Sequence, residues 1–422
     1  MKFVRVGICA LVAFGVLAHG GVEDWSRAVF ETGIAVLFVA WAVWVYLHSE
    51  ETIIISPLLP PMVGLLLVVL AQLLFATSAS PFNTHQEFTL LLADVIMVFL
   101  AVQAFRTLED WRGFVWFVMI FGFVVSVFGI LQHLTFNGKL YWFREMHYGG
   151  IPFGPYVNRN HFAGFAELVI PMSLVPLMLG KVRRERWFIV GLFAVVSIGS
   201  LFLAASRGGI VSFAVEVVVV VVWISFRRMG AKQMLGGAAV LIAALVMVSW
   251  LGVKEIAQRF SSMKAMEVSS GKRASMRRDA WRIFVDHPWM GTGLGTLQIV
   301  FPAYDTLYDG KIVNHAHNDY VEALAETGMA GGLCCALFLG LLLFDSAQQL
   351  SGGNASFAAV LNLSGLVACI GFLVHSLVDF NLHLPANAQL FFLIATLATS
   401  IIVPVNAAAT APAHGRSHSR KR

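Results

Sequence analysis

The sequence is poor in charged residues. They occupy only 13% of the 422 positions, whereas hydrophobic residues occupy 58% and the mean hydropathy is +0.77. Soluble domains carry roughly 25% charged residues, so a soluble fold is excluded for the body of the chain. The roughly ten-residue alternating segments of outer-membrane barrels are also missing. Helices, which satisfy their own backbone hydrogen bonds, are the remaining way to span a bilayer.

Cysteine is scarce, and the net charge is modest. The four cysteines lie inside apolar runs, without a CxxC pair or a histidine at metal-binding spacing: Cys9, Cys334, Cys335 and Cys369. This excludes a disulfide framework and a zinc site and predicts small core residues. The net charge of +5 resides mainly in short loops between apolar runs. Lipid headgroups and membrane topology explain such loops, so no nucleic-acid partner is expected.

Long apolar runs are abundant, and each is long enough for a membrane helix. They lie near 4–19, 28–47, 53–76, 88–105, 113–134, 161–180, 187–205, 209–226, 234–252, 328–344, 357–378 and 387–404. We therefore predict an all-α membrane protein with about 12 transmembrane helices and one polytopic domain over 1–406. The first run also resembles a signal peptide, but a retained helix is favoured. The polar, low-complexity segment 407–422 is predicted to be a disordered cytoplasmic tail.

Basic residues predict the sidedness of the chain. They concentrate in alternate loops: Lys2 and Arg5; Arg106 and Arg112; Lys181 to Arg186; Arg227, Arg228 and Lys232; and Arg416 to Arg422. The short loops between them, 20–27, 77–87 and 379–386, contain only Arg27. Because basic loops stay in the cytoplasm, both termini are predicted to be cytoplasmic. Segments 135–160, 206–208 and 253–327 are then extracytoplasmic.

The segment 253–327 is too long for a connection in a compact bundle. It is rich in residues that can bury apolar surface: Trp281, Ile283, Phe284, Trp289, Phe301, Tyr304 and Tyr308. We therefore predict a folded, partly helical extracytoplasmic cap between the ninth and tenth membrane helices, rather than a disordered linker.

Arginines mark the extracytoplasmic segments. Arg207 stands between two apolar runs with almost no loop, and an arginine at the bilayer centre costs about 2.5–3.5 kcal/mol. Gly208 and Gly209 would let the backbone approach closely while the guanidinium binds a phosphate. The alternative is that Arg207 extends to lipid headgroups and the glycines merely make a turn.

Further arginines lie in the cap and before the sixth run. Arg278 and Arg282 are spaced i, i+4 and can share one face of a cap helix, with Arg277 at its border. Arg159 lies within Asn158 to His161. Lys272 and Arg273 are instead expected to form a solvated face.

Two histidines, His315 and His317, follow the cap. At i, i+2 they do not share a helical face, which disfavours a metal site of the HExxH kind. Histidine accepts a proton near neutral pH, so a general base is one hypothesis and an interfacial hydrogen-bonding role is the other. Glu322 and Glu326 are expected on the surface of a helix that leads into the next span, with an acid/base pair as the alternative.

Together these motifs resemble the bacterial O-antigen ligase and O-antigen polymerase superfamily, membrane glycosyltransferases of the GT-C type. The resemblance covers about Asn158 to Gly332. Its most specific parts run from Arg277 through Trp281 to Gly295, and from His315 through Asn318 and Tyr320 to Gly328. It implies a multi-pass protein of the bacterial inner membrane with its active site facing the periplasm.

The resemblance also implies a reaction. A glycan would pass, with inversion and without a metal or cofactor, from an undecaprenyl-diphosphate carrier to a hydroxyl of lipid A core or a growing polysaccharide. His317 would be the base, with His315 and Asn318 orienting it. Arg207, Arg277 and Arg282 would bind the diphosphate, with Arg159 and Arg278 as second choices. Membrane lipids would be the other partners.

Three alternatives stay open. A polysaccharide polymerase and a protein glycosyltransferase carry the same motif within this superfamily. A solute transporter would instead place ionisable residues near the bilayer midplane, and the chief candidates are Asp94, Glu167, Glu216 and His375.

The bidentate hypothesis for Arg207 gives the first testable prediction. Arg207→Ala should weaken use of the lipid-linked donor, and Arg207→Lys should restore it poorly, because lysine lacks the planar fork that binds two phosphate oxygens. The measurement is the initial transfer rate against donor concentration in reconstituted vesicles. Full rescue by lysine would reject the bidentate contact.

Overall fold

The computed structural model describes residues 1–48, 52–146, 151–227, 231–261, 263–308, 310–351 and 356–402. Within these ranges the chain forms fourteen α-helices and two short 3-10 helices, and it forms no named strand. The all-α membrane class is thereby confirmed. The predicted tail 407–422 lies outside the described residues.

Every predicted apolar run coincides with a helix. These are α1 (Lys2–Leu17), α2 (Asp24–Leu47), α3 (Leu59–Leu74), α4 (Pro81–Ala104), α5 (Leu108–Leu134), α6 (Arg159–Met178), α7 (Arg184–Ala204), α8 (Arg207–Phe226), α9 (Ala231–Ser261), α12 (Asp319–Leu350), α13 (Phe357–His375) and α14 (Pro385–Thr399). In the described part, eight helices are long and apolar enough to cross a membrane, and three further apolar segments are shorter. The number of twelve spans therefore stays a prediction.

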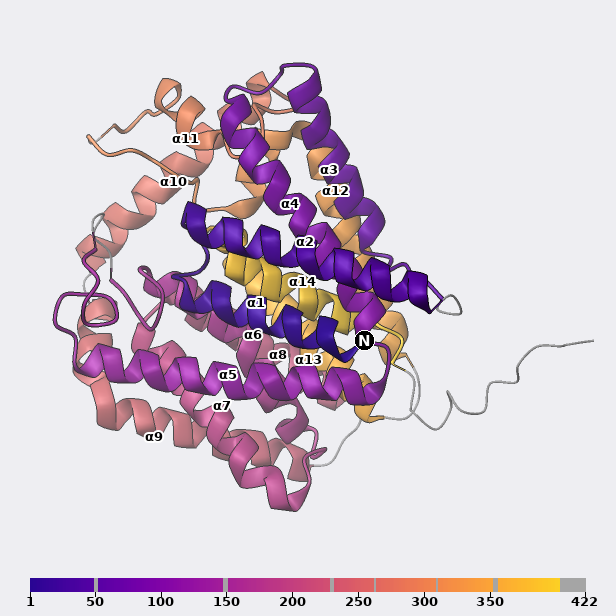
Figure 1. Ribbon diagram of the computed structural model, residues 1–422. Coiled ribbons are helices and arrows are strands. Elements are labelled where there is room, and N and C mark those ends of the chain that lie inside the picture. The colour runs from indigo at the N-terminus through magenta and orange to yellow at the C-terminus, as the bar shows by residue number, and fades with distance from the viewer. Residues whose placement is uncertain are drawn as a thin grey trace, which may run out of the picture.

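Helix α6 forms the centre of the bundle. All of its residues from Phe162 to Met178 are buried, although Pro171 and Pro176 interrupt its backbone hydrogen bonding. It packs against α13, α7, α5 and α8. Figure 1 shows α5 and α7 running side by side across the lower part of the view. The helix ends and loops that lie at the Arg159 end of α6 therefore surround its first turn.

The helix ends separate into two groups. At one end, Arg5 of α1 pairs with Asp110 of α5, and Arg227 donates to the Leu350 carbonyl at the end of α12. At the other end, three helices begin with side-chain caps from Asn158, Ser206 and Asn318. Which of these two ends faces the cytoplasm stays a prediction.

The segment between α9 and α12 contains α10 (Met263–Asp286), α11 (Leu297–Val300) and the 3-10 helix η1 (Phe301–Ala303). Figure 1 shows α10 and α11 at the upper left, beside the bundle. Ile283 and Phe301 are buried in a separate apolar cluster, whereas Trp281, Trp289 and Tyr308 are exposed. The segment therefore has its own small core, built from part of the apolar set predicted for it.

A kink in α12 joins this segment to the bundle. Gly328 has φ 61° and ψ −161° inside the helix, so residues 319–327 form a separate first portion of α12. The glycine is required, because a Cβ at Gly328 would lie 2.4 Å from the backbone carbon of Trp289. Met329 and Ala330 donate backbone hydrogen bonds to Pro288 and Trp289. This close backbone contact fixes the position of the segment around Trp289 against α12.

A glycine substitution tests this contact. Gly328→Ala should destabilise the fold by about 2 kcal/mol or more, since L-residues avoid this backbone conformation and the new methyl group would overlap Trp289. Gly340→Ala, in the same helix with nothing within 4 Å of the added Cβ, should be neutral or stabilising by up to about 1 kcal/mol. Apparent melting temperatures in detergent measure both, and equal values would contradict the role of Gly328.

Candidate functional site

The loop 376–384, between α13 and α14, docks on the first turn of α12. Asn318 caps α12 by accepting from the Val321 amide and donates its own amide to the Leu377 carbonyl at 2.9 Å. Asp319 donates its backbone N–H to the Ser376 carbonyl and accepts from the Leu382 amide. These contacts bring a loop that follows by almost sixty residues against the predicted histidine motif.

This docking places a buried carboxylate beside His317. Nδ1 of His317 lies 3.3 Å from Oδ1 of Asp379, whose other oxygen accepts from Nδ2 of Asn160 at 2.6 Å. Asp379 is fully buried, and the His317 side chain is 23% exposed. His317 also has φ 52°, an uncommon conformation for a non-glycine residue. The carboxylate therefore fixes one ring nitrogen and leaves Nε2 for another partner.

Asp379 is charged in this setting. Burial acts to raise its pKa, but the hydrogen bond and charge of His317, together with His375 and His161, hold the pKa of Asp379 well below its usual range. Nη2 of Arg273 adds a positive charge 3.8 Å from Oδ2. When His317 is neutral, an ionised Asp379 favours the tautomer with the proton on Nδ1 and the lone pair on Nε2.

Phe380 packs the histidines together. The His315 ring stacks on it with centroids 4.2 Å apart, and the rings of His317 and His161 meet its edges at 5.0 and 4.8 Å. Nε2 of His161 is buried without a hydrogen-bond partner among the described residues. Phe380 thus holds three imidazoles around one apolar surface.

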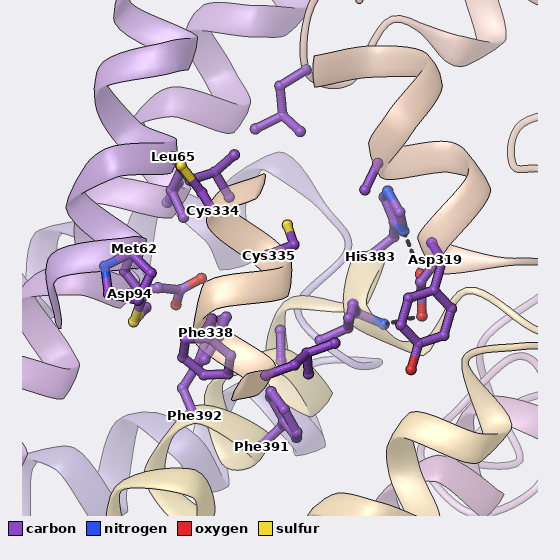
Figure 2. A pocket seen from close by; sticks show the side chains of 18 of the residues that line it. Met62, Leu65, Asp94, Asp319, Cys334, Cys335, Phe338, His383, Phe391 and Phe392 are labelled. Atoms are coloured by element: carbon purple, nitrogen blue, oxygen red, sulfur yellow. Dashed lines mark hydrogen bonds and ion pairs between the residues drawn. The ribbon is translucent and has the colours of Figure 1, made fainter. Parts of the chain in front are cut away.

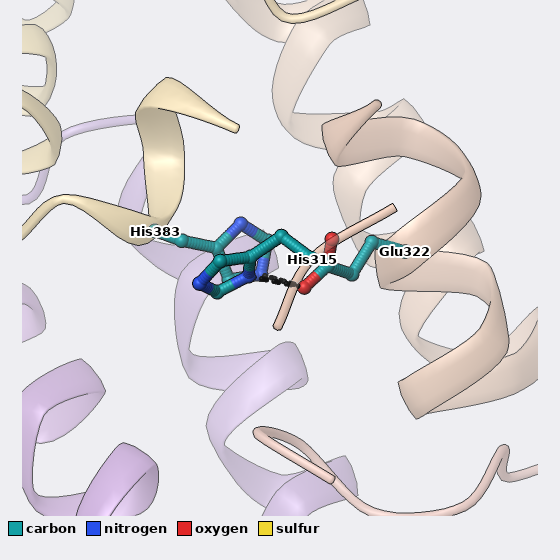
Figure 3. Close-up of side chains that lie close together, drawn as sticks. All are labelled: His315, Glu322 and His383. Carbon is teal, nitrogen blue, oxygen red and sulfur yellow. Dashed lines mark hydrogen bonds and ion pairs between the residues drawn. The ribbon is translucent and has the colours of Figure 1, made fainter. Parts of the chain in front are cut away.

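A second charged group lies behind His315. Nδ1 of His315 is 2.7 Å from Oε1 of Glu322, and His383 contacts both Asp319, at 2.8 Å through Nδ1, and Glu322, at 3.3 Å through Nε2. Figure 3 shows the two rings converging on the Glu322 carboxylate. The Ala316 amide donates to the other Glu322 oxygen at 2.8 Å.

The spacing of His315, Glu322 and His383 could suit a metal ion, since their ligand atoms lie within 4.8 Å of one another. The protonation of His383 favours a different arrangement. Burial acts to lower the pKa of His383, but the charge of Glu322 and the hydrogen bond to Asp319 raise it to about 10. The imidazolium therefore supplies the positive charge that the two carboxylates require. A metal would have to displace its proton.

The expectation that Glu322 and Glu326 lie on a helix surface is wrong, because both are buried. Glu326 accepts from the backbone amides of Gly295 and Leu297 at 2.9 and 2.8 Å. It therefore satisfies two backbone N–H groups of the segment between α9 and α12. Sequence spacing gave no sign that a second segment would cover this face.

The arginines of α10 divide between two faces of that helix. Arg273 reaches the site, where Nη1 donates to the Val378 carbonyl at 3.1 Å. Arg277 is one turn further along the same face and is partly buried. The expectation that Arg273 is merely solvated is wrong.

Arg278 and Arg282 lie on a more exposed part of α10. Arg278 is exposed, and the Arg282 side chain is 59% exposed with Nη1 4.0 Å from Asp279. Arg282 lines a cavity with Asp286, Tyr304 and Asp305. Arg277 thus shares the face of α10 that carries Arg273, whereas Arg278 and Arg282 lie on the more exposed part. The roles of all three stay predictions.

Arg207 and Arg159 begin the helices α8 and α6 at this end of the bundle. The ring of His375, at the end of α13, would be 2.6 Å from a Cβ at Gly208, so glycine permits the approach of α8 to the loop that carries Asp379. Nδ1 of His375 lies 2.9 Å from Glu167. Nη1 of Arg159 is buried without a hydrogen-bond partner among the described residues. An anion would satisfy that guanidinium.

An apolar cavity of about 350 Å³ opens beside the charged groups. Asp319 and His383 lie at one side of it, and Leu65, Cys334 and Phe391 line its apolar wall between α3, α12 and α14. Figure 2 shows this arrangement, with Asp94 reaching into the cavity from the opposite side. Cys335 also lines it, whereas Cys369 is buried. The cavity joins apolar surface between helices to polar groups at the helix ends.

The residues that sequence reasoning missed follow one pattern. Asp379, Phe380 and His383 lie in a loop noted only for its lack of basic residues, and Arg273 was placed in a solvated face. The segment Asp379 to His383 was the signal that could have identified them. It places one acidic, one aromatic and one imidazole side chain in a short connection between apolar runs. Such a polar group between two apolar runs is costly to bury unless it has partners.

Comparison with known proteins agrees with the sequence motifs. The family model described as O-Antigen ligase matches residues 192–336, which include Arg207, Arg277 and His317. The Teichuronic acid biosynthesis protein TuaE of Bacillus subtilis (strain 168) is 25% identical over 310 residues, covering 68% of this chain and 60% of that protein. The chain thus spans less than two thirds of this relative's length. The predicted resemblance is confirmed.

The raised pKa of His383 predicts a pH dependence of stability. Because its folded-state pKa is about 10 and its ordinary value is 6.5, its contribution is fully present below pH 6.5 and is lost as the pH rises through 10. His383→Gln should therefore lower the apparent melting temperature strongly at pH 6.5 and much less at pH 10. A difference that is the same at both pH values would mean that the proton of His383 contributes nothing.

Proposed function

We propose that this chain, whose residues 192–336 match the family model described as O-Antigen ligase, is a membrane glycosyltransferase of polysaccharide biosynthesis. It would move a glycan from an undecaprenyl-diphosphate carrier to an acceptor hydroxyl on the periplasmic side. The observation that carries this proposal is the contact of His317 with the buried Asp379, among arginines at the ends of apolar helices. A base and cations at one membrane boundary suit a reaction between a hydroxyl and a lipid diphosphate.

His317 would act as the general base. Its Nε2 accepts the proton as the acceptor oxygen bonds to the anomeric carbon, and Asp379 stabilises the imidazolium that results. Such a proton transfer contributes about 10²–10⁴-fold to the rate. His315 and Asn318 would position it, His315 through Phe380 and Asn318 through the cap that fixes the adjacent backbone.

The leaving diphosphate requires cations rather than an acid. The bond from the anomeric carbon to the diphosphate oxygen breaks with its electron pair on that oxygen, and inversion follows from attack on the opposite side. Charge-assisted hydrogen bonds from arginine contribute about 1.5–3 kcal/mol each. The candidates at this end of the bundle are Arg207, Arg159, Arg277 and Arg273, with Arg278 and Arg282 on the outer face of α10.

The apolar cavity supports a lipid-linked donor. Its walls suit a hydrocarbon chain, and its polar side at Asp319 and His383 faces the same charged cluster as His315. A donor with its chain between α3, α12 and α14 would therefore present its head near the base. Water-soluble sugar nucleotides would gain nothing from such a cavity.

Two acceptor classes suit this arrangement. Lipid A core is the acceptor that an O-antigen ligase would use. The name of the relative concerns teichuronic acid biosynthesis, which favours the hydroxyl of a growing polysaccharide as the second candidate. Transfer to a protein would use the same base.

A reconstituted transfer assay tests the proposal. Purified protein in vesicles receives a defined undecaprenyl-diphosphate glycan with lipid A core, free glycan or peptide as acceptor. We expect transfer to one of the first two, a fall in kcat of about 10²–10⁴-fold for His317→Ala, and a fall of at least about tenfold for Asp379→Asn with little change in the KM of the donor.

His48→Ala is the matched control, because His48 is an exposed histidine at the far end of α2, and it should retain activity within about twofold. Folding of every variant is checked by a monodisperse size-exclusion profile after extraction from membranes in detergent. Full activity of folded His317→Ala would reject this residue as the base, and no transfer by the wild-type protein to any acceptor would reject the proposed reaction.

A further inference from the structure

A second cavity lies at the end of the bundle opposite the histidines. It has a volume of about 290 Å³ and is formed by α5, the end of α6, the start of α7 and the start of α13. Helix α6 begins at the histidine site with Arg159 and ends at this cavity with Met178. Its 20 residues span about 30 Å, which is the thickness of a bilayer core. The second cavity and the histidine site therefore lie at opposite ends of α6.

Four cations line this cavity: Arg112, Lys181, Arg183 and Arg186. None of its lining residues is acidic. Across the ranges that the structure describes, none of the four is within ion-pair distance of a carboxylate. Lys181, Arg183 and Arg186 are exposed and Arg112 is partly buried, so solvent partly screens their mutual repulsion, and an anion bound among them would reduce it further. We call this cavity the basic cavity.

Aromatic rings hold two of these cations in place. The Arg112 guanidinium lies 5.8 Å from the ring centroid of Phe357, and the Arg186 guanidinium lies 5.5 Å from that of Trp116. A cation–π contact uses the flat face of the guanidinium and leaves its N–H groups at the edge able to donate. The two arginines are therefore oriented without a carboxylate to neutralise them.

The remaining lining of the basic cavity is apolar. Val115 and Met119 of α5, Met172 and Pro176 of α6, and Leu361 of α13 are among these residues. A soluble anion such as inorganic phosphate would gain little from such surface. A phospholipid would use both parts, with its phosphate among the cations and the upper part of its acyl chains against the apolar residues. Basic cavities between helices at the cytoplasmic surface are typical sites for such lipids.

We propose that the basic cavity binds the phosphate headgroup of an anionic membrane phospholipid in the leaflet predicted to be cytoplasmic. The lipid would join α5, α6, α7 and α13 at the end of α6 that lies away from the histidine site. It would thereby fix the vertical position of α6, whose other end carries the site. The proposal is independent of the transfer reaction, so its test requires no activity measurement.

Lipid binding by the purified full chain tests the proposal. Native mass spectrometry compares phosphatidylglycerol with phosphatidylethanolamine, and a thermal-shift titration with glycerol 3-phosphate provides the soluble phosphate. We expect phosphatidylglycerol to be retained and to raise the melting temperature, phosphatidylethanolamine to bind at least about tenfold more weakly, and glycerol 3-phosphate to have no effect. A shift by glycerol 3-phosphate equal to that by the lipid would replace the lipid site with a free-phosphate site and overturn the proposal.

Two variants distinguish lipid binding in the basic cavity from a general effect of surface charge. Arg112→Gln with Arg186→Gln should weaken phosphatidylglycerol binding at least about tenfold. Lys2→Gln with Arg184→Gln removes the same charge at the same end from residues that do not line the basic cavity, and it should change binding less than twofold. Equal losses in both variants would overturn the proposal. If the double cavity variant does not fold, Arg186→Gln alone, at an exposed side chain, provides the same comparison.

Discussion

The candidate site depends on one buried carboxylate, that of Asp379, which requires hydrogen-bond donors and positive charges around it. Asp379 is fully buried at a membrane boundary, where an unpaired charge is severely unfavourable. Its partners come from three distant parts of the chain: Asn160 at the start of α6, Arg273 on α10 and His317 before α12. If any of these elements moved away, the carboxylate would lose a compensating group. The same contacts that stabilise Asp379 therefore hold His317, Arg273 and the central helix in one arrangement.

Charge balance repeats around this centre. His383 lies between Asp319 and Glu322, and Glu322 also accepts from His315 and from a backbone amide. Breaking a buried pair is costly because it leaves the other charge uncompensated. These groups are also the ones that fasten the loop 376–384 to α12. The polar network thus connects α12 to the loop between α13 and α14. It also sets where His317 stands relative to the cavity.

The polar residues at the two ends of the bundle have different surroundings. At the histidine end, cations are accompanied by buried carboxylates and helix caps, which gives each side chain a defined position. At the basic cavity, cations face aromatic rings and apolar residues without carboxylates. The first arrangement suits a reaction in which charge moves, and the second suits retention of a fixed anion. Helix α6, buried along almost its whole length, connects them.

The sequence by itself determined the all-α membrane class, the positions of all twelve apolar helices and the motif around His317. The length of an apolar run can be read locally, and backbone polar groups in lipid must be hydrogen-bonded within the same segment, so both properties can be predicted without knowing the fold. Tertiary structure alone decided that Asp379, Phe380 and His383 join that motif, that Arg273 rather than the outer face of α10 reaches it, and that Glu322 and Glu326 are buried. These facts depend on which loop covers which helix end. Apolar helices of similar composition carry little information about their neighbours, so the partners of a polar residue emerge only when the bundle is assembled.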